Sequence, residues 1–595
     1  MAVALRNSFR RFAGLSWLIG PILDKELRVS SRRARNYILR FAYLIFLTTY
    51  VVLIWLHAVD YGAAGLFTVS RMARAGKSII SSVVWFQFCV TQIVVVIMLS
   101  TSISEEIYNR TLGLLMTTPI SSFQIVMGKL FSKLLQLILL MAISLPLLAI
   151  VRIFGGVPWD YIVSSLCITL TSIVFVGSIS LFFSIFTRRG YVSIILTCAT
   201  LGALFFGIPF LFGLIYHLCT GDWPGRTLTS VLFYDNPVMV LMLNSQKMMS
   251  PAAGRGFAAF YWPLHCGIML VGSIFVLIVS IIMVRRVALR QAIGERQLFR
   301  RRSASESVEP AQSKGMHEPG RIRRVTGSAV TWKEMRLPLL GRRKTLMLIA
   351  VLVGLSGLLM SYIALGANDD LDDEDVHIVY AIIFLGFGML FSIVIPATTI
   401  TSEKESRCWP LLVATTLGEN EILLGKFIGS FRRCLPAWFP LLGHVFIFSL
   451  MGLIHPIAVF LTIILVIWLV TFLFGTGLYF SVRSRHTTTA VVLNFALAVV
   501  IWAILPMLGF IALNAMDAPD DLAEDYLDTH PLLQTAIIMD ATVDEKGMPD
   551  FDWPGKGHVG AIESTIWMLI CMGIYGFLGF LFAWRAKRRL RRNIF

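Results

Sequence analysis

The chain contains two copies of one segment, 297 positions apart. Residues 114–129 align without a gap with residues 411–426, and the same offset carries Glu106 onto Glu403. A period of this length is far longer than that of solenoid repeats, so it predicts two equivalent units fused in one chain. We therefore expect the function to lie where the two units meet.

The composition is too apolar for a soluble protein. Of the 595 residues, 56% are hydrophobic and only 15% are charged, whereas soluble domains have about 25% charged residues. A helix that crosses a bilayer needs roughly 20 apolar residues, because lipid cannot satisfy a bare backbone. Six such runs occur in each half, near residues 37–59, 80–103, 131–152, 161–186, 191–216 and 261–284, and near 346–366, 378–400, 434–454, 456–480, 488–514 and 562–584.

These runs predict the fold class and the domains. We expect an all-α polytopic membrane protein with twelve transmembrane helices, arranged as two tandem six-helix repeats. Residues 1–284 form the first six-span domain with an N-terminal amphipathic helix, and residues 331–595 form the second. Between them, residues 285–330 are rich in Arg, Ser, Glu, Gln and Pro, which cannot bury enough apolar area to fold. This segment is predicted to be a flexible basic cytoplasmic linker.

Basic residues gather on one side of the predicted membrane. When both termini are placed in the cytoplasm, most of the 52 Lys and Arg residues fall on the cytoplasmic side, and most of the 35 acidic residues fall outside. Loops rich in Lys and Arg stay cytoplasmic during insertion. We therefore predict a multi-pass protein of the plasma (inner) membrane with cytoplasmic N- and C-termini.

The net positive charge does not indicate nucleic-acid binding. Arginine clusters such as residues 300–302 and 585–592 lie just beyond predicted spans, where they would contact anionic headgroups of the membrane lipid. The eight cysteines show neither a disulfide framework nor metal-ligand spacing. The acidic run at 369–375 lacks the spacing of an EF-hand loop. We therefore predict no metal site and no cofactor of the chain's own.

The strongest local motif lies between spans two and three of each half. Glu106 and Arg110 are four positions apart with the acid first, the favourable order for an ion pair on a helix, and Glu403 and Arg407 repeat this spacing. The adjacent leucines 114–115 and the adjacent threonines 117–118 follow. The pattern predicts a short amphipathic helix along the membrane surface that offers a shaped face to a cytoplasmic partner. The alternative is that these residues only turn the chain.

A charged amphipathic segment precedes the first span of each half. Residues 22–28 separate leucines from charges at roughly helical spacing, and residues 332–336 repeat the pattern before a second basic run. Such segments are typical of interfacial helices. A simple topology anchor is the alternative interpretation.

The longest outer loops, at about 217–260 and 515–561, contain matching proline turns. The first turn has the sequence Asp-Asn-Pro-Val at 235–238, and the second has Thr-His-Pro-Leu at 529–532. Short apolar runs flank both prolines. These turns predict either re-entrant hairpins that cover an outer gate or ordinary surface loops.

The repeated motif, with the Lys-Glu-Leu-Arg sequence and arginines before span one, resembles the membrane subunits of ABC-2 type transporters. The resemblance covers essentially the whole chain as two fused permease domains, and it is sharpest over 104–129 and 402–426. It implies that each loop between spans two and three is a coupling helix that docks on a separate ABC ATPase subunit, with two copies of that subunit. It also implies that the amphipathic segment is the connecting helix beside it.

Carried over by position, this resemblance names the site residues. The docking residues would be Glu106, Arg110, Leu115, Thr118 and Pro119 in the first half and Glu403, Arg407, Leu412 and Thr415 in the second, while the connecting helices would contribute Lys25, Glu26, Arg28, Lys333, Glu334 and Arg336. The second copy departs from the first, because Cys-Trp-Pro at 408–410 replaces Thr-Leu-Gly at 111–113. Its docking is therefore expected to be weaker or differently shaped.

The chain itself is not predicted to hydrolyse ATP. Gly128-Lys129 and Gly425-Lys426 lack the upstream glycine and the hydroxyl residue of a phosphate-binding loop. ATP would be bound by the partner subunit. We predict a permease subunit that exports an apolar or amphipathic substrate whose identity the sequence does not give.

Two other classes of protein fit the same pattern. An ion-coupled secondary carrier usually has acids inside its spans, yet no Asp or Glu lies deep in a predicted span, where the polar residues are Gln92, Gln136, His444 and Asn494. A membrane scaffold that engages an ATPase without transporting anything would share the docking motif.

Overall fold

The computed structural model describes most of the chain. The described residues are 21–31, 68–108, 111, 117–118, 120–153, 157–187, 190–220, 233–249, 261–292, 327–336, 344–367, 370–506, 509, 521–543, 547–591 and scattered positions between 37 and 52. Nearly all of them are helical. The predicted all-α polytopic membrane protein is confirmed at this level.

Long apolar helices make up both halves of the structure. In the first half they are α4 (Thr68–Ser100), α7 (Ser122–Ile153), α8 (Trp159–Phe186), α9 (Gly190–Gly202) continuing through η1 (Ala203–Gly207) into α10 (Ile208–Thr220), and α13 (Trp262–Ala292). In the second they are α15 (Lys344–Gly366), α16 (Glu374–Thr398), α19 (Glu419–Leu450), α20 (Ile457–Arg483), α21 (Thr487–Val499) with η5 (Val500–Ile504), and α25 (Ala561–Arg589). Within the described residues, nine helices are long and apolar enough to cross a membrane.

The helices largely follow the predicted spans. The predicted first run near 37–59 lies mostly outside the described residues, and the other eleven runs each overlap a helix. The predicted domain limits shift, because α13 continues past 284 to Ala292 and the next helix, α14 (Ala329–Arg336), begins inside the predicted linker. Most of that linker, 293–326, lies outside the described residues.

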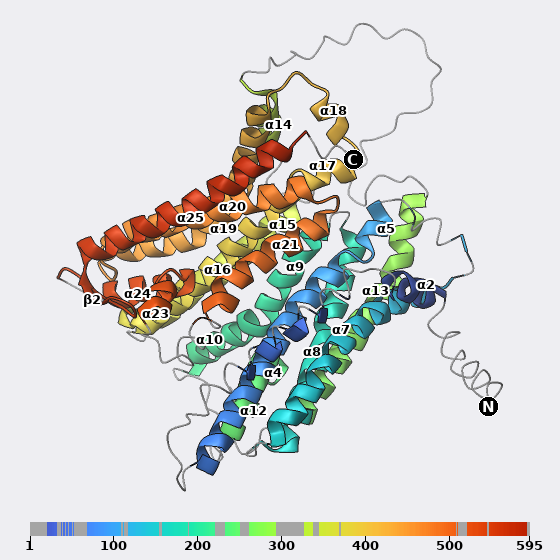
Figure 1. Cartoon of the computed structure of the whole chain (residues 1–595), viewed down its shortest axis with the longest axis horizontal. Coiled ribbons are helices and arrows are strands. Elements are labelled where there is room, and N and C mark those ends of the chain that lie inside the picture. The colour runs from blue at the N-terminus through green and yellow to red at the C-terminus, as the bar shows by residue number, and fades with distance from the viewer. Residues whose placement is uncertain are drawn as a thin grey trace.

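Short elements lie at the two ends of the long helices. One end carries α2 (Pro21–Ser31), α5 (Ser104–Tyr108), α14, α17 (Thr401–Glu405) and α18 (Trp409–Val413), and the other carries α12 (Pro237–Met249), α23 (Asp521–Leu527) and α24 (Pro531–Thr542), as Figure 1 shows. The short turns η2 (Phe233–Asp235) and η4 (Asp370–Asp372) contact α12 and α16, respectively. A hairpin that the sequence did not predict completes this second end. Its strands β1 (Asp550–Trp553) and β2 (Gly557–Gly560) pair antiparallel, and the turn uses a positive φ of 66° at Gly557.

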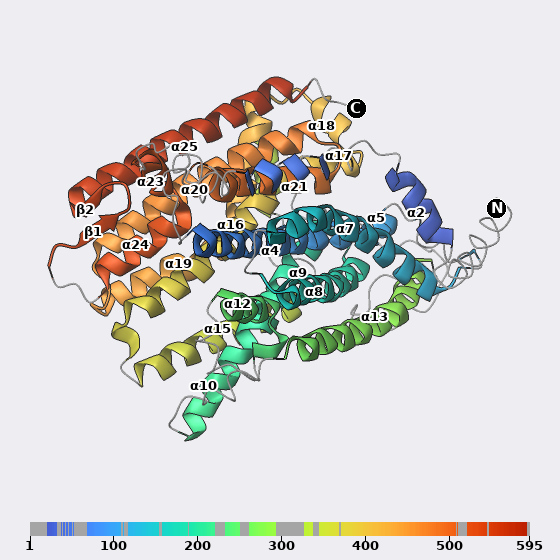
Figure 2. The same ribbon diagram turned by 60° about the horizontal axis from the view of Figure 1, so that its bottom comes forward.

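The long helices of the first half are numbered with the predicted span near 37–59 as the first. Two lobes meet along the fifth long helix of each half, which is α9–η1–α10 in the first half and α21–η5 in the second. The first lobe holds α4, α7, α8 and α13, and the second holds α16, α19, α20 and α25, as Figure 1 shows. Between them α9 packs on α16 and α21, and α10 packs on α15. Figure 2 shows α10 and α15 side by side in the turned view. Apolar residues of both halves, such as Ile194 and Val491, share one core at this contact.

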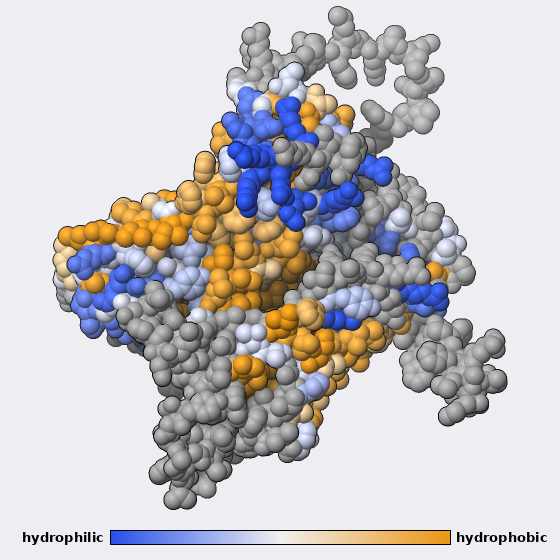
Figure 3. All heavy atoms as spheres, viewed as in Figure 1, coloured by the Kyte–Doolittle hydropathy of each residue, from blue (hydrophilic) through white to orange (hydrophobic). Residues whose placement is uncertain are grey.

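The molecular surface separates apolar from polar regions. Figure 3 shows a continuous hydrophobic band over the second lobe, bounded by hydrophilic residues at the end with α14 and α18 and again near β2 and α24. Many large apolar side chains on α25 and α13 are exposed, including Phe580 and Phe275, each 68% exposed. A band of this kind is what a helix bundle presents to lipid.

Candidate partner-docking site

The helix α14 lies directly against the backbone of α19. Its buried face consists of Val330 and Glu334, one helical turn apart. They face Gly425 and Gly429 of α19, where a Cβ atom would come within 2.8 Å of Val330 Cγ1 and 2.5 Å of Glu334 Cβ. A pair of glycines four residues apart allows such close approach. The predicted connecting helix, α14, is therefore fixed on α19, the third long helix of the second half.

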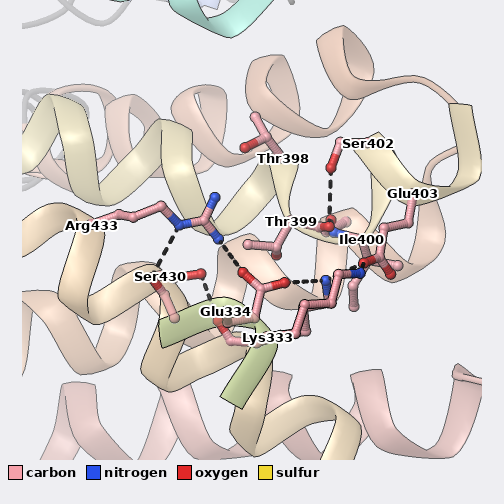
Figure 4. A network of polar contacts seen from close by, with 12 residues as sticks. Lys333, Glu334, Thr398, Thr399, Ile400, Ser402, Glu403, Ser430 and Arg433 are labelled. Atoms are coloured by element: carbon pink, nitrogen blue, oxygen red, sulfur yellow. Dashed lines mark hydrogen bonds and ion pairs between the residues drawn. The ribbon is translucent and has the colours of Figure 1, made fainter. Parts of the chain in front are cut away.

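A buried ion cluster joins α14, α17 and α19. Lys426 Nζ donates to Glu334 Oε1 and to Glu403 Oε1, each at 2.6 Å. Arg433 Nη2 lies 3.1 Å from Glu334 Oε2, and Lys333 Nζ lies 3.1 Å from Glu403 Oε1. Figure 4 shows Glu334 and Glu403 converging from different segments, with Arg433 on the far side of Glu334. We call these five residues the second ion cluster.

The centre of the second ion cluster is almost dry, whereas Lys333 at its edge is 60% exposed. The Lys426 and Glu334 side chains are 2% and 3% exposed. Burial by itself would raise the pKa of Glu403, but Lys426 and Lys333 outweigh it and hold the pKa below its ordinary value. Taking one partner out of such a pair leaves an uncompensated buried charge. The three segments are thus tied together as a unit.

The first half has the same cluster in a wetter form. Lys129 Nζ of α7 lies 3.0 Å from Glu26 Oε1 of α2 and 3.1 Å from Glu106 Oε1 of α5, and Lys133 Nζ lies 3.6 Å from Glu26 Oε2. Burial would raise the pKa values of both glutamates, yet the lysines lower them. Lys129 and Glu106 precede their counterparts Lys426 and Glu403 by 297 positions. We call Lys129, Glu26, Glu106 and Lys133 the first ion cluster.

A serine fixes the same turn in both halves. The hydroxyl of Ser184 accepts hydrogen bonds from the amides of Ile103 and Ser104, both at 2.9 Å. Ser481, 297 positions later, accepts from Ile400 at 3.0 Å and Thr401 at 3.1 Å. Each serine lies near the end of the fourth long helix, α8 or α20. The turn that precedes each predicted docking segment is therefore held by the same contact.

Three consecutive residues of α17 bind three different helices. Glu403 belongs to the second ion cluster. Lys404 Nζ donates to carbonyl oxygens at the C-terminal end of α20, including that of Ser484 at 3.1 Å, and burial lowers its pKa to about 8. Glu405 accepts from the amide and hydroxyl of Thr487, at 2.7 and 2.6 Å, where α21 begins. Both charges have the sign that the helix dipole favours at these ends.

The predicted helical ion pairs are wrong in the second half. Within the part of the chain that the structure describes, no ion pair joins Glu403 to Arg407. The helix α17 ends at Glu405, and Arg407 adopts a φ of 57°, which no helix interior allows. In the first half Arg110 lies outside the described residues, and the partner of Glu106 is Lys129. The sequence analysis missed Lys129 and Lys426, although the repeated Gly-Lys pair was a usable signal.

The tip of the second docking segment exposes a residue that the sequence analysis missed. Leu411 on α18 is 73% exposed, whereas the predicted Leu412 packs inward against the cluster around buried Trp409. Thr415 is exposed, and its hydroxyl donates to the carbonyl of Leu412 at 2.6 Å. Leu411, rather than Leu412, is therefore the apolar side chain that this segment presents outward.

The remaining predicted residues fall into two groups. Thr118 is exposed, while Leu115 and Pro119 lie outside the described residues. Lys25 is exposed, and Arg28 pairs with Asp24 on the outer face of α2 at 2.8 Å. The guanidinium of Arg336 lies 4.0 Å from the centre of the Trp332 ring, a cation–π contact typical of a membrane interface. Of these cations, Lys25 acts on the first ion cluster, where it helps to lower the pKa of Glu106.

Comparison with known proteins places this architecture in a family. Residues 267–575 match the family model described as ABC-2 family transporter protein. The match covers more than half of the chain, from α13 through most of α25. None of the curated proteins compared with the chain matches it. Members of this family are the membrane transport component of an ABC transporter and not its ATPase. The chain belongs to the ABC-2 family of transporter proteins.

Proposed function

We propose that the chain is the membrane-spanning subunit of an ATP-driven ABC-2 exporter, and that it docks two copies of a separate ATPase through residues 104–119 and 401–417. The observation that carries this proposal is the pair of ion clusters. In each half a connecting-helix glutamate, a glutamate at the start of the docking segment and a lysine of the third long helix meet in one unit. Because the cluster ties these segments together, a displacement of the docking segment would move the connected long helices as one rigid unit.

The contacts of α17 supply a path from the docking segment to the interface between the lobes. A displacement of α18 would reach α19 through Glu403, α20 through Lys404 and α21 through Glu405. The helix α21 packs on α9 of the first half. Nucleotide-driven motion of an ATPase would thus reach the place where the two halves meet, which is where we place the transport pathway.

The proposed architecture has twelve spans in two tandem six-helix repeats. Equivalent contacts at the same offset support it, namely the lysine–glutamate pairs and the serines that hold the turns. The span that the sequence predicts near 37–59 completes the first repeat. The ends with α2 and α14 carry most of the basic residues, so we place them and both termini in the cytoplasm and the protein in the plasma (inner) membrane.

The proposed cargo is apolar or amphipathic. The helices between the lobes bring together apolar residues such as Ile194, Val394 and Ala490 in one core. A pathway that opens between such surfaces suits a lipid-like or hydrophobic molecule better than an ion.

The test uses the exposed tip rather than the buried glutamates. Reversing the charge of Glu403 would disrupt the second ion cluster and confound docking with folding. Leu411→Asp changes a side chain that is 73% exposed, and Leu450→Asp, equally exposed at the far end of α19, is the matched control. The complex is purified with its endogenous ATPase, and native mass spectrometry counts the ATPase copies.

We expect the Leu411→Asp complex to keep one ATPase instead of two and to lose more than tenfold in ATPase activity. The control should keep both copies. Adding Thr118→Asp in the first docking segment should remove the remaining copy. Two bound copies in the double variant would refute the docking assignment.

A further inference from the structure

The fifth long helix of each half contains a π-helical segment at the same position. The first is η1, closed by a hydrogen bond from the amide of Ile208 to the carbonyl of Ala203. The second is η5, closed from Leu505 to Val500, and every residue of it follows its counterpart by 297 positions. A π segment displaces backbone carbonyls from the helical ladder, and such segments occur frequently at functional sites.

In the first half, an outer helix binds a displaced carbonyl. Asn236 is the residue before α12, and its Nδ2 donates to the carbonyl of Phe205 in η1 at 3.0 Å. Its Oδ1 accepts from the amide of Val238 at 3.0 Å, which caps α12. The side chain is fully buried. One amide group therefore holds the start of α12 and the π segment together.

In the second half, a different residue fills the same role. His530 is the residue before α24, and its Nδ1 accepts from the amide of Leu532 at 3.2 Å. The backbone of Trp502 in η5 acts on this ring and opposes the lowering of its pKa by burial, and Trp502 follows Phe205 by 297 positions. Nearby, the Tyr526 hydroxyl donates to the carbonyl of Ile501 at 2.6 Å.

The two residue types share one chemical property. The position needs an acceptor for the amide of its own helix and a donor for the carbonyl of the π segment. Asparagine and neutral histidine each provide both groups on one rigid side chain, whereas aspartate provides acceptors only. The turns around Asn236 and His530 share only the proline, so the contact persists where the surrounding sequence has changed.

The π segments divide each fifth helix at a functionally useful place. On one side, α9 and α21 pack across the interface between the lobes, and on the other, α10 packs on α15. The aromatic residue of each segment also contacts an aromatic residue of the fourth long helix, with ring centres of Phe205 and Phe175 6.1 Å apart and those of Trp502 and Phe472 5.6 Å apart. The helix α10 therefore cannot reorient unless this point rearranges.

We propose that Asn236 and His530 are positioning residues of an outer gate. Each holds the π segment of its fifth helix in the closed arrangement, and in the first half its release lets α10 swing aside for the exported molecule. The gate role rests on the proposed function, because it requires an exporter. We call the contact of each of these residues with its π segment the latch. The latch is a property of the chain alone and does not depend on the proposed function.

The first experiment measures hydrogen exchange of the full chain in lipid nanodiscs. Asn236→Asp keeps the cap of α12 but removes the donor, so exchange in residues 203–210 should become about tenfold faster, the effect of losing roughly 1.4 kcal/mol. Residues 500–507 should not change. The control is Asn244→Asp on the same helix, which loses donation to Ser164 and Ser165 instead.

Two further variants separate the latch from a general loss of packing. Asn236→His should restore slow exchange, because histidine fills this role in the second half. His530→Asp should accelerate residues 500–507 and leave 203–210 unchanged. The latch would be overturned if Asn244→Asp accelerated exchange in residues 203–210 as much as Asn236→Asp does. It would also be overturned if neither Asn236→Asp nor His530→Asp accelerated exchange in its own π segment.

The second experiment repeats the measurement on the complex with its ATPase, using a non-hydrolysable ATP analogue. Nucleotide should accelerate exchange in both π segments of the wild-type chain, and Asn236→Asp should show fast exchange in the first segment without nucleotide. If nucleotide left hydrogen exchange in both π segments of the wild-type chain unchanged in an active complex, the proposed gate role would be overturned. Failure of any ATPase to bind would instead refute the proposed function, and it would be seen in the purification itself.

Discussion

Replacing Lys426 with methionine should destabilise the second half strongly, and the matched change at Lys129 should matter less. Methionine keeps most of the length of the lysine side chain and removes only the charge and its donors. Lys426 is 2% exposed and bonds Glu334 and Glu403 at 2.6 Å. Lys129 holds the equivalent position in the first half, so the chain provides its own control.

The size of the effect follows from what each lysine leaves behind. Removing one partner of a buried ion pair costs about 3–5 kcal/mol. Glu334 would keep Arg433 and Glu403 would keep Lys333, both at 3.1 Å, so we expect the lower limit, about 3 kcal/mol. The partners of Lys129 are 21% and 23% exposed and can be solvated, so Lys129→Met should cost about 1 kcal/mol.

The assay is reversible unfolding of the purified chain in mixed detergent micelles with increasing dodecyl sulfate. A double variant, Lys426→Met with Glu334→Met, should recover about 2 kcal/mol of the loss, because a buried pair can be replaced by apolar residues at little cost. A loss below about 0.5 kcal/mol for Lys426→Met, or equal losses for the two single variants, would refute the reasoning from burial.

Two other changes test separate parts of the fold. Burial raises the pKa of Asp528 to about 6, so its protonated form favours the folded state. The free energy of unfolding should therefore decline by at most roughly 3 kcal/mol as the pH rises from about 4 to 6. Unfolding of Asp528→Asn measured across that range should lack this decline, and a decline that persists in the variant would contradict the assignment. Gly429→Ala should cost about 1–3 kcal/mol in the same micelle assay, because its Cβ would meet Glu334 Cβ at 2.5 Å. Gly443→Ala on the same helix has open space for its Cβ and should not change stability. Equal effects of the two alanines would show that the close packing of α14 on Gly429 is not the cause of the lost stability.

The repeat and the long apolar runs could be read from the sequence because they depend on periodicity alone. A run such as 161–186 must become a helix in lipid, whatever its neighbours are, and it does so in α8. The repeated motif marked the position of the short helices α5 and α17 in the same way. The sequence also indicated the matching proline turns before Val238 and Leu532, without showing what they bind.

The partners of the charged residues required the tertiary structure. Local spacing favoured Arg407 for Glu403, a contact worth only a few tenths of a kcal/mol. A lysine 23 positions away on α19 offers a dry, hydrogen-bonded contact instead, and such a contact outweighs any local pair once the helices pack. The π segments were equally invisible, since the carbonyl of Phe205 is bound by Asn236 and that of Ile501 by Tyr526, residues of other segments.

The sequence by itself determined that this is a helical membrane protein with an internal repeat, because hydrophobicity and self-similarity are written along the chain. Only the tertiary structure decided which glutamate meets which lysine, which leucine faces outward on α18, and where the fifth helices are held. Those properties depend on how closely helices distant in sequence approach one another. Small residues such as Gly425 and Gly429 set that approach, because they leave room for the side chains of the helix that packs on them.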